Sequence, residues 1–144
     1  RRYQMDLKLT ADDLASFLQR DFTLVADDFE FVEVTPNHVI MALSAEEKHL
    51  RPGGTVSGPA MFGLADVCAY FCILSKLGPV ALAVTTSCSI DFMRKPAPGR
   101  LLCRMELLKL GRALAVTEGR LYSEDAPHKP VARASLTYSL PPGS

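Results

Sequence analysis

The feature that most restricts how this chain can fold is an apolar run over residues 59–74, in which Asp66 carries the only charge. Such a run predicts a helix that is buried on all sides. The run is shorter than the eighteen or so residues expected of a membrane-spanning segment, and it contains a carboxylate. We therefore interpret it as the core helix of a soluble protein, with no membrane partner. The rest of the chain must be arranged around this helix.

The ends of this helix are marked by residues with special backbone preferences. Gly58 suits the N-cap, and Pro59 suits the first helical position, where the missing proline N–H has no helical partner to lose. Gly78 is followed by another proline, which predicts that the helix ends just before it. We therefore predict a central helix over about residues 59–77.

Patterns on either side of this helix predict a second helix and several strands. Residues 10–22 should form a helix, because a threonine can cap it and apolar residues recur at helical spacing. Two β-rich runs around a Thr-Pro-Asn turn predict a hairpin over residues 29–34 and 38–43. Strict alternation after the central helix predicts a half-buried strand, the first of four strands in an antiparallel meander, at about residues 84–92, 101–110, 114–123 and 131–138.

This order of elements predicts an α+β fold with a single domain over residues 1–144, in which one curved antiparallel sheet wraps around the long central helix. One sheet can cover only part of an apolar helix. Because the chain has no second domain, a second copy of the chain is the natural source of the remaining cover. We expect self-association as a homodimer, or as a dimer of dimers that forms a homotetramer.

Composition argues against several classes of protein. The chain has 16 basic and 16 acidic residues and no basic cluster, which argues against a nucleic-acid partner. Residues 1–9 lack the apolar segment of a signal peptide, so we expect a cytoplasmic location. The cysteines have no histidine near them in the sequence, so we expect no metal site. All four lie inside apolar runs, as reduced core thiols do: Cys68, Cys72, Cys88 and Cys103.

Asp66 is the first candidate for chemistry. A carboxylate without water around it costs several kcal/mol unless partners stabilise it or it takes up a proton. A chain that tolerates such a group usually gains a function from it. The alternative is a structural role, in which a hydroxyl or a backbone amide satisfies the carboxylate.

The start of the central helix is the second candidate. The N–H groups of Gly58, Ala60 and Met61 should lack helical partners, and the helix dipole adds partial positive charge there. Such an end could hold an anion or a developing oxyanion, although an ordinary capped helix is the alternative. Gly58 and Asp66 are eight residues apart, which is about 12 Å along a helix. One reacting group cannot contact both within one chain, so a shared site would need two subunits around a two-fold axis.

Four segments of the chain have the residues and the spacing that are typical of one known family. They are residues 57–66 (SGPAMFGLAD), residues 83–96 (AVTTSCSIDFMRKP), Gly99, and the pair Gly111-Arg112. Together they resemble the hotdog-fold acyl-CoA thioesterases of the phenylacetate-degradation type, over about residues 25–140. The resemblance implies a hotdog fold and an enzyme that hydrolyses an acyl-CoA thioester to free acid and coenzyme A. It implies no separate cofactor, because coenzyme A is part of the substrate.

The resemblance also assigns roles to individual residues. Asp66 would act as general base on water or as nucleophile, and Thr85 falls where the family often carries a hydroxyl that orients the water. The Gly58 N–H would polarise the thioester carbonyl of a substrate bound across the dimer interface. The acyl group would run past two aromatic residues, and basic turn residues could contact the coenzyme A phosphates, although such residues are usually only solvated. The substrate-binding residues expected in this way are Arg51, Ser57, Phe62, Tyr70, Arg94, Lys95 and Arg112.

This chain departs from the family pattern at the start of the helix. Many members have histidine where this chain has Ser57, and asparagine or glutamine where it has Arg51. Ser57 can form a hydrogen bond but supplies no imidazole, and Pro59 removes one N–H from the site. Arg51 is always charged and could bind a carboxylate or phosphate of the ligand. These differences leave open the acyl group and whether turnover survives.

Three other functions compete with this interpretation. A non-catalytic hotdog protein that binds acyl-CoA or another small ligand is the main alternative. A hotdog dehydratase would use a histidine, but none of His38, His49 and His128 falls at the start of the helix. A serine hydrolase is excluded, because Ser57 is the fourth residue of the segment from Gly54 to Gly58, and the Gly-x-Ser-x-Gly motif requires serine at the third.

Overall fold

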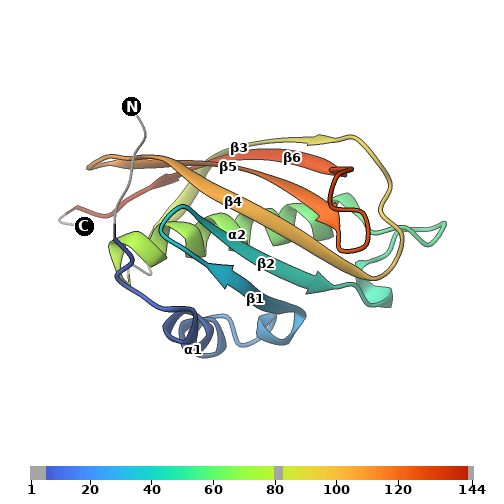
Figure 1. Cartoon of the computed structure of the whole chain (residues 1–144), viewed down its shortest axis with the longest axis horizontal. Coiled ribbons are helices and arrows are strands. Elements are labelled where there is room, and N and C mark those ends of the chain that lie inside the picture. The colour runs from blue at the N-terminus through green and yellow to red at the C-terminus, as the bar shows by residue number, and fades with distance from the viewer. Residues whose placement is uncertain (1–5, 80–82, 143–144) are drawn as a thin grey trace.

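The computed structural model describes residues 6–79 and 83–142 of the chain. Its six strands form one antiparallel sheet in the order β1-β2-β4-β5-β6-β3, which curves over the long helix α2 (Figure 1). This is the predicted hotdog fold. The elements are α1 (Ala11–Asp21), the short helix η1 (Ala26–Asp28), β1 (Phe29–Val34), β2 (His38–Ser44), the short helix η2 (Glu47–His49), α2 (Gly58–Leu77), β3 (Val84–Phe92), β4 (Arg100–Leu110), β5 (Leu114–Ser123) and β6 (Ala132–Ser139).

The order of the last four strands differs from the prediction. The β1–β2 hairpin is confirmed, and β4, β5 and β6 form a meander. However, β3 pairs with β6 and not with β4, so the predicted four-strand meander is wrong. Alternation along a sequence predicts that a segment is a strand, but it does not say which other strand will pair with it. The segment 93–99 crosses from the edge of the sheet to reach β4.

The helix α1 forms for the reasons that the sequence suggested. The hydroxyl of Thr10 accepts a hydrogen bond from the Asp13 N–H, and the Asp13 carboxylate accepts one from the Thr10 N–H. This reciprocal cap fixes the first turn. Leu14 and Phe17 are buried against the rest of the core.

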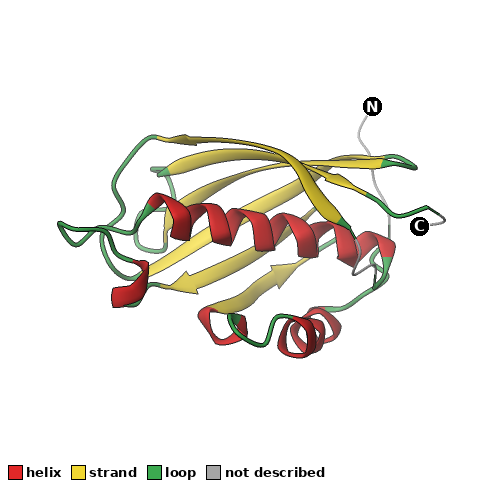
Figure 2. Ribbon diagram, turned by 180° about the vertical axis from the view of Figure 1, so that it is seen from behind, coloured by secondary structure: helices red, strands yellow, loops and turns green. Residues whose placement is uncertain are grey.

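The central helix α2 is buried on all sides over residues 68–76, but on one side only over its first half. Leu64, Cys68 and Phe71 have no exposed surface, whereas Phe62 is 37% exposed and Asp66 is half-buried. In Figure 2, α2 lies in front of the sheet and α1 lies beside the second half of the helix, where Phe17 packs on Tyr70 and Phe71. The prediction of burial on all sides is therefore confirmed for the second half of α2 and wrong, within a single chain, for the outward face of the first half. We call this outward face, which contains Phe62, Gly63, Asp66 and Val67, the open stripe.

The helix is also longer than its apolar run. With 20 residues and a mean hydropathy of 1.6, Gly58–Leu77 is long and apolar enough to cross a membrane by length and composition. However, 67% of its apolar window is buried inside the chain. Burial of this extent is typical of the core helix of a soluble fold.

The edge strand β3 is more exposed than predicted. Eight of its nine residues are exposed, so the expected half-buried strand is wrong. Cys68, Cys72 and Cys103 are buried, and the Cys68 thiol donates to the carbonyls of Val39 and Cys103, both at 3.4 Å. Cys88 lies on β3 and is exposed, so it is not the core thiol that the sequence suggested.

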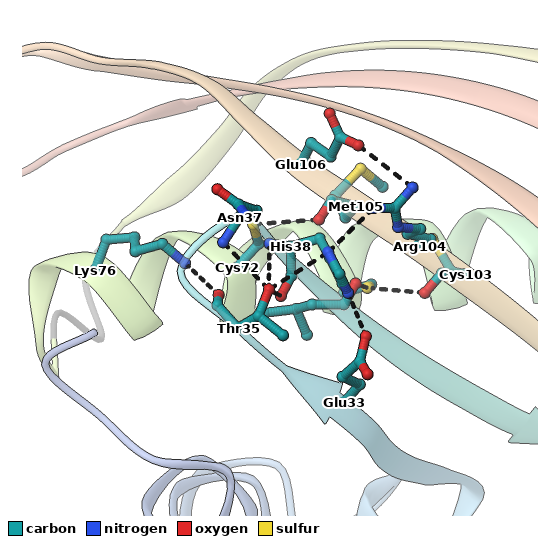
Figure 3. A network of polar contacts seen from close by, with 12 residues as sticks. Glu33, Thr35, Asn37, His38, Cys72, Lys76, Cys103, Arg104, Met105 and Glu106 are labelled. Atoms are coloured by element: carbon teal, nitrogen blue, oxygen red, sulfur yellow. Dashed lines mark hydrogen bonds and ion pairs between the residues drawn. The ribbon is translucent and has the colours of Figure 1, made fainter. Parts of the chain in front are cut away.

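A buried lysine ties the end of α2 to the β1–β2 turn (Figure 3). Lys76 is 1% exposed, and its ammonium donates to the carbonyl of Thr35 and to the hydroxyl of Ser75, both at 3.1 Å. Burial lowers the pKa of Lys76. The same turn is fixed from the other side by His38, whose ring contacts Glu33 and Arg104.

Candidate active site

The carboxylate of Asp66 is held by two hydroxyl groups. The Thr85 hydroxyl on β3 donates to Oδ1 at 2.7 Å, and the Tyr138 phenol on β6 donates to the same oxygen at 2.5 Å. The phenol oxygen also lies 2.8 Å from the backbone carbonyl oxygen of Asp66. Among the described residues, Asp66 forms no ion pair and Oδ2 has no hydrogen-bond partner. The site therefore stabilises the carboxylate without occupying both of its oxygens.

A β-bulge brings Thr85 to this position. Thr85 pairs directly with Tyr138, and the register then shifts before Ser87 pairs with Thr137. Without the extra residue, Thr85 would face the same side as Ser87, away from α2, as strict alternation predicts. The bulge instead turns Thr85 inward beside Tyr138, in keeping with the tendency of bulges to re-aim side chains near functional sites.

Tyr138 is the site residue that sequence reasoning missed. It ends the inward-facing row of β6, in which the other members are alanine and leucine. A phenol on an apolar strand face is the available sequence signal, because a buried hydroxyl needs a partner. Burial raises the pKa of Tyr138 well above its usual value, and the charge of Asp66 raises it further. Tyr138 therefore stays protonated and acts as a donor at working pH.

The start of α2 differs in detail from the prediction. Ser57, rather than Gly58, is the N-cap, and its hydroxyl accepts from the Ala60 N–H at 3.2 Å. The Ser57 carbonyl accepts from the Met61 N–H at 3.1 Å. Gly58 is the first helical residue, and its N–H is the one member of the predicted group without an acceptor in the described parts of the chain. The site thus offers a single N–H rather than three.

A cleft of about 310 Å³ opens at this end of α2. It brings together Gly58 and three of the predicted basic residues, Arg51, Arg94 and Lys95. The Arg94 guanidinium also donates to the carbonyl of Pro130 at 2.6 Å, which holds this side chain at the rim of the cleft. The cleft has the positive charge expected of a site for an anionic ligand.

The other predicted binding residues lie outside this cleft. Arg112 is in the β4–β5 turn, at the opposite end of the sheet from Gly58 (Figure 1). Phe62 lies on the open stripe, next to Asp66 along the helix. Tyr70 is only 6% exposed, and its ring packs on four aromatic neighbours, Phe17, Phe22, Phe71 and Tyr138. Burial raises the pKa of Tyr70 to about 12.

A second cleft, of about 350 Å³, lies on the outer face of the sheet and contains none of the predicted site residues. Its lining includes Tyr122, which is half-buried. Within residues 6–79 and 83–142, no three His, Cys, Asp or Glu side chains are grouped so as to hold a metal ion.

Known proteins share both the sequence pattern and the fold. Residues 53–127 match the sequence profile of the thioesterase superfamily. A protein of Pseudomonas aeruginosa named as a "putative esterase" is 32% identical over 104 residues, which cover 72% of this chain and 75% of that protein. A "putative thioesterase" from Silicibacter sp. TM1040 has a crystal structure that matches with a TM-score of 0.90 and 48% identity, covering 99% of this chain and 100% of that one.

A further solved structure bears on the type of thioesterase. A mutant of the phenylacetic acid degradation protein PaaI from Thermus thermophilus matches with a TM-score of 0.71 and 26% identity, covering 84% of this chain and 100% of that one. The chain therefore belongs to the thioesterase superfamily, as the sequence resemblance implied. It is a thioester hydrolase with the hotdog fold.

Proposed function

We propose that this protein hydrolyses an acyl-CoA thioester, with Asp66 as the catalytic carboxylate. The observation that carries the proposal is the arrangement around Asp66, in which two hydroxyls hold one carboxylate oxygen and leave the other open on the exposed side of α2. A structural aspartate would be expected to have both oxygens satisfied.

As a general base, Asp66 takes a proton from a water molecule while the water oxygen bonds to the thioester carbon. Negative charge then develops on the carbonyl oxygen, where a backbone N–H stabilises it. When the tetrahedral intermediate collapses, the C–S bond breaks and the thiolate of coenzyme A takes up the proton held by Asp66. As a nucleophile, Asp66 would instead attack the carbonyl carbon, the C–S bond would break to release the thiolate of coenzyme A, and water would then hydrolyse the resulting anhydride to the free acid and the Asp66 carboxylate. Both routes need a free carboxylate oxygen.

The N–H that stabilises this charge is proposed to be that of Gly58 from a second copy of the chain. Gly58 and Asp66 of one chain are separated by about 12 Å along α2, too far to contact one thioester group. A two-fold axis beside the open stripe would make two α2 helices antiparallel, so that Gly58 of one chain could approach Asp66 of the other. The proposal therefore requires a homodimer, either alone or within a homotetramer.

The cleft at the start of α2 is proposed to receive the phosphates of coenzyme A. Arg51, Arg94 and Lys95 supply the charge, and arginine can bind a phosphate through two parallel hydrogen bonds. Arg112 lies too far away within one chain, but the antiparallel partner would bring its own β4–β5 turn toward this end. The acyl group would lie along the open stripe past Phe62.

The test is the Asp66→Asn variant, assayed by thiol release from short, long and aromatic acyl-CoA esters. Asparagine keeps the shape of the side chain but can neither take a proton nor attack a carbonyl, so we expect kcat to fall by about a hundredfold or more. The fold should survive. Asp27→Asn, which neutralises an exposed carboxylate on η1, is the matched control and should keep full activity. Near-full activity in Asp66→Asn would contradict the proposal, and binding of every ester without thiol release by the wild type would favour the ligand-binding alternative.

A further inference from the structure

The further inference concerns Tyr138, and it rests on the proposed role of Asp66. Tyr138 lies on β6, 72 positions after Asp66 in the sequence. Its phenol oxygen lies within hydrogen-bond distance of two oxygens of Asp66, the backbone carbonyl oxygen and Oδ1. A phenol has one proton, so it donates to one acceptor at a time. The backbone carbonyl of a residue inside a helix already accepts from the N–H four positions later. The ionised carboxylate is the stronger acceptor, so the phenol proton belongs to the bond with Oδ1.

Thr85 directs its hydroxyl to the same oxygen. Because Thr85 and Tyr138 are directly opposite each other in the β3–β6 ladder, their side chains project to the same side and meet at Oδ1. Two donors on one oxygen restrict rotation of the carboxylate group. The second oxygen, Oδ2, is left without a protein partner within the described residues.

We propose that Tyr138 is a positioning residue which, together with Thr85, fixes the Asp66 carboxylate so that Oδ2 is the reacting oxygen. In this arrangement Oδ2 takes the proton from water, or attacks the thioester carbon, while Oδ1 stays bonded to the two hydroxyls. The raised pKa of Tyr138 supports this role, because a phenol that stays protonated can donate its hydrogen bond to Oδ1 throughout the reaction. Misplacement of a reacting group by about 1 Å can lower a rate a hundredfold, so fixing the carboxylate has a direct effect on turnover.

The principal test is the Tyr138→Phe variant, which removes the hydroxyl and keeps the ring that packs on Tyr70. We expect kcat to fall about tenfold, within the usual effect of a misplaced catalytic group, with KM changed less than about twofold because Tyr138 does not touch substrate. Tyr122→Phe is the matched control, since it removes the hydroxyl of a half-buried tyrosine on the outer face of the sheet. It should keep wild-type kcat.

A double-variant cycle separates positioning from a structural role. If Tyr138 acts through Asp66, adding Tyr138→Phe to Asp66→Asn should not lower the residual rate further, whereas a general structural defect would lower it in both backgrounds. The conservative substitution Thr85→Ser should keep most of the activity, and Thr85→Val should lose kcat in the same way as Tyr138→Phe.

Each outcome either supports or overturns the positioning role of Tyr138. Wild-type kcat in Tyr138→Phe, or an equal loss of rate in the Asp66→Asn background, would overturn the positioning role. Failure of Tyr138→Phe to fold would assign the hydroxyl to structure and would overturn it as well. These results are distinct from failure of the proposed function, which is decided by the activity of Asp66→Asn alone.

Discussion

Asp66 forms no ion pair with a cation among the described residues, which agrees with the reacting role proposed for it. An arginine beside the carboxylate could occupy both oxygens through a bidentate pair. The two hydroxyls of Thr85 and Tyr138 supply hydrogen bonds to one oxygen without such competition. The half-buried position of Asp66 on the open stripe also leaves room for a second chain to complete the site.

At the residue scale, the free N–H of Gly58 can be tested by a pair of substitutions. Gly58→Pro removes the N–H, and we expect it to lower kcat by about a hundredfold or more, as loss of an oxyanion donor does. Gly58→Ala keeps the N–H, and its added methyl group would lie 3.5 Å from the Phe92 ring, which is an ordinary contact. Steady-state kinetics of the two variants should therefore differ sharply. Equal losses in both would show that shape, and not the N–H, matters at this position.

The residues of the site were predictable to different degrees. Asp66 stands out in the sequence because it is the single charge in an apolar run, and Gly58 because it precedes a helix. Thr85 was reached only through resemblance to a family, since strict alternation would have turned it away from α2. Tyr138 was not predicted at all. Its proposed role depends on the β3–β6 pairing and on a bulge, and both arise from contacts between residues distant in sequence.

At the scale of elements, periodicity predicted both long helices and all six strands but not every environment. The apolar run gave α2 correctly, because an unbroken apolar run of this length rarely forms anything but a core helix. The alternation of β3 resembles that of a half-buried strand, yet this strand lies at the sheet edge and is exposed on both faces in one chain. Alternation of apolar and polar residues indicates that one face of a strand is suited to burial. It does not indicate whether the same chain or a second chain would cover that face.

The contact between β4 and β5 depends on a glycine. A methyl group at Gly119 would lie 2.2 Å from the carbonyl oxygen of Arg104 and 2.7 Å from the sulfur of Met105. Because backbone cannot move away as a flexible side chain can, we expect Gly119→Ala to lower the free energy of unfolding by about 2–3 kcal/mol. Urea denaturation measures this change.

Gly63→Ala is the comparison for this substitution. Gly63 lies within α2, and its added methyl group would meet no atom within 4 Å. Alanine is the better helix former, so the variant should gain roughly 0.5–1 kcal/mol. A loss of stability at Gly63 as large as that at Gly119 would mean that the clash with β4 is not the cause.

The buried Lys76 predicts how stability changes with pH. Burial lowers the pKa of Lys76 in the folded state, while in the unfolded chain it keeps its usual value. Between these two pKa values, the unfolded state therefore binds more protons than the folded state. As a result, the contribution of Lys76 to the free energy of unfolding rises with pH across this range, and it reaches its full value above the pKa of the unfolded chain. The Lys76→Met variant lacks this dependence. Urea unfolding from neutral pH to about pH 10 should show the wild type gaining stability relative to the variant. A constant difference would contradict the prediction.

At the scale of the whole molecule, one chain leaves several apolar groups uncovered in one region. Phe62 on the open stripe is 37% exposed, and Val84 and Phe92 at the two ends of β3 are 56% and 50% exposed. The outer edge of β3 also has backbone groups with no neighbouring strand among the described residues. Edge strands with unpaired backbone readily pair with another chain.

We therefore expect a stable homodimer, or a tetramer built from dimers, at micromolar concentration. Sedimentation equilibrium would measure it, and a single species with the 15.7 kDa mass of one chain would contradict it. A charged residue on the edge strand, as in Val84→Lys, should weaken the association, because the Val84 side chain is 56% exposed in one chain. Loss of association should be accompanied by loss of thioesterase activity if the site needs both chains.

The eight-residue separation of Gly58 from Asp66 has a genetic consequence. If each site takes Gly58 from one chain and Asp66 from the other, two alleles that are inactive alone can complement each other within one cell. An Asp66→Asn chain paired with a Gly58→Pro chain forms one dimer site with both groups intact and one with neither. Random pairing makes half of the dimers mixed, so co-expression should restore roughly a quarter of wild-type activity. In the same arrangement, an Asp66→Asn allele should not interfere with a normal one, because each normal chain still supplies its Asp66 to one intact site, even within a mixed dimer.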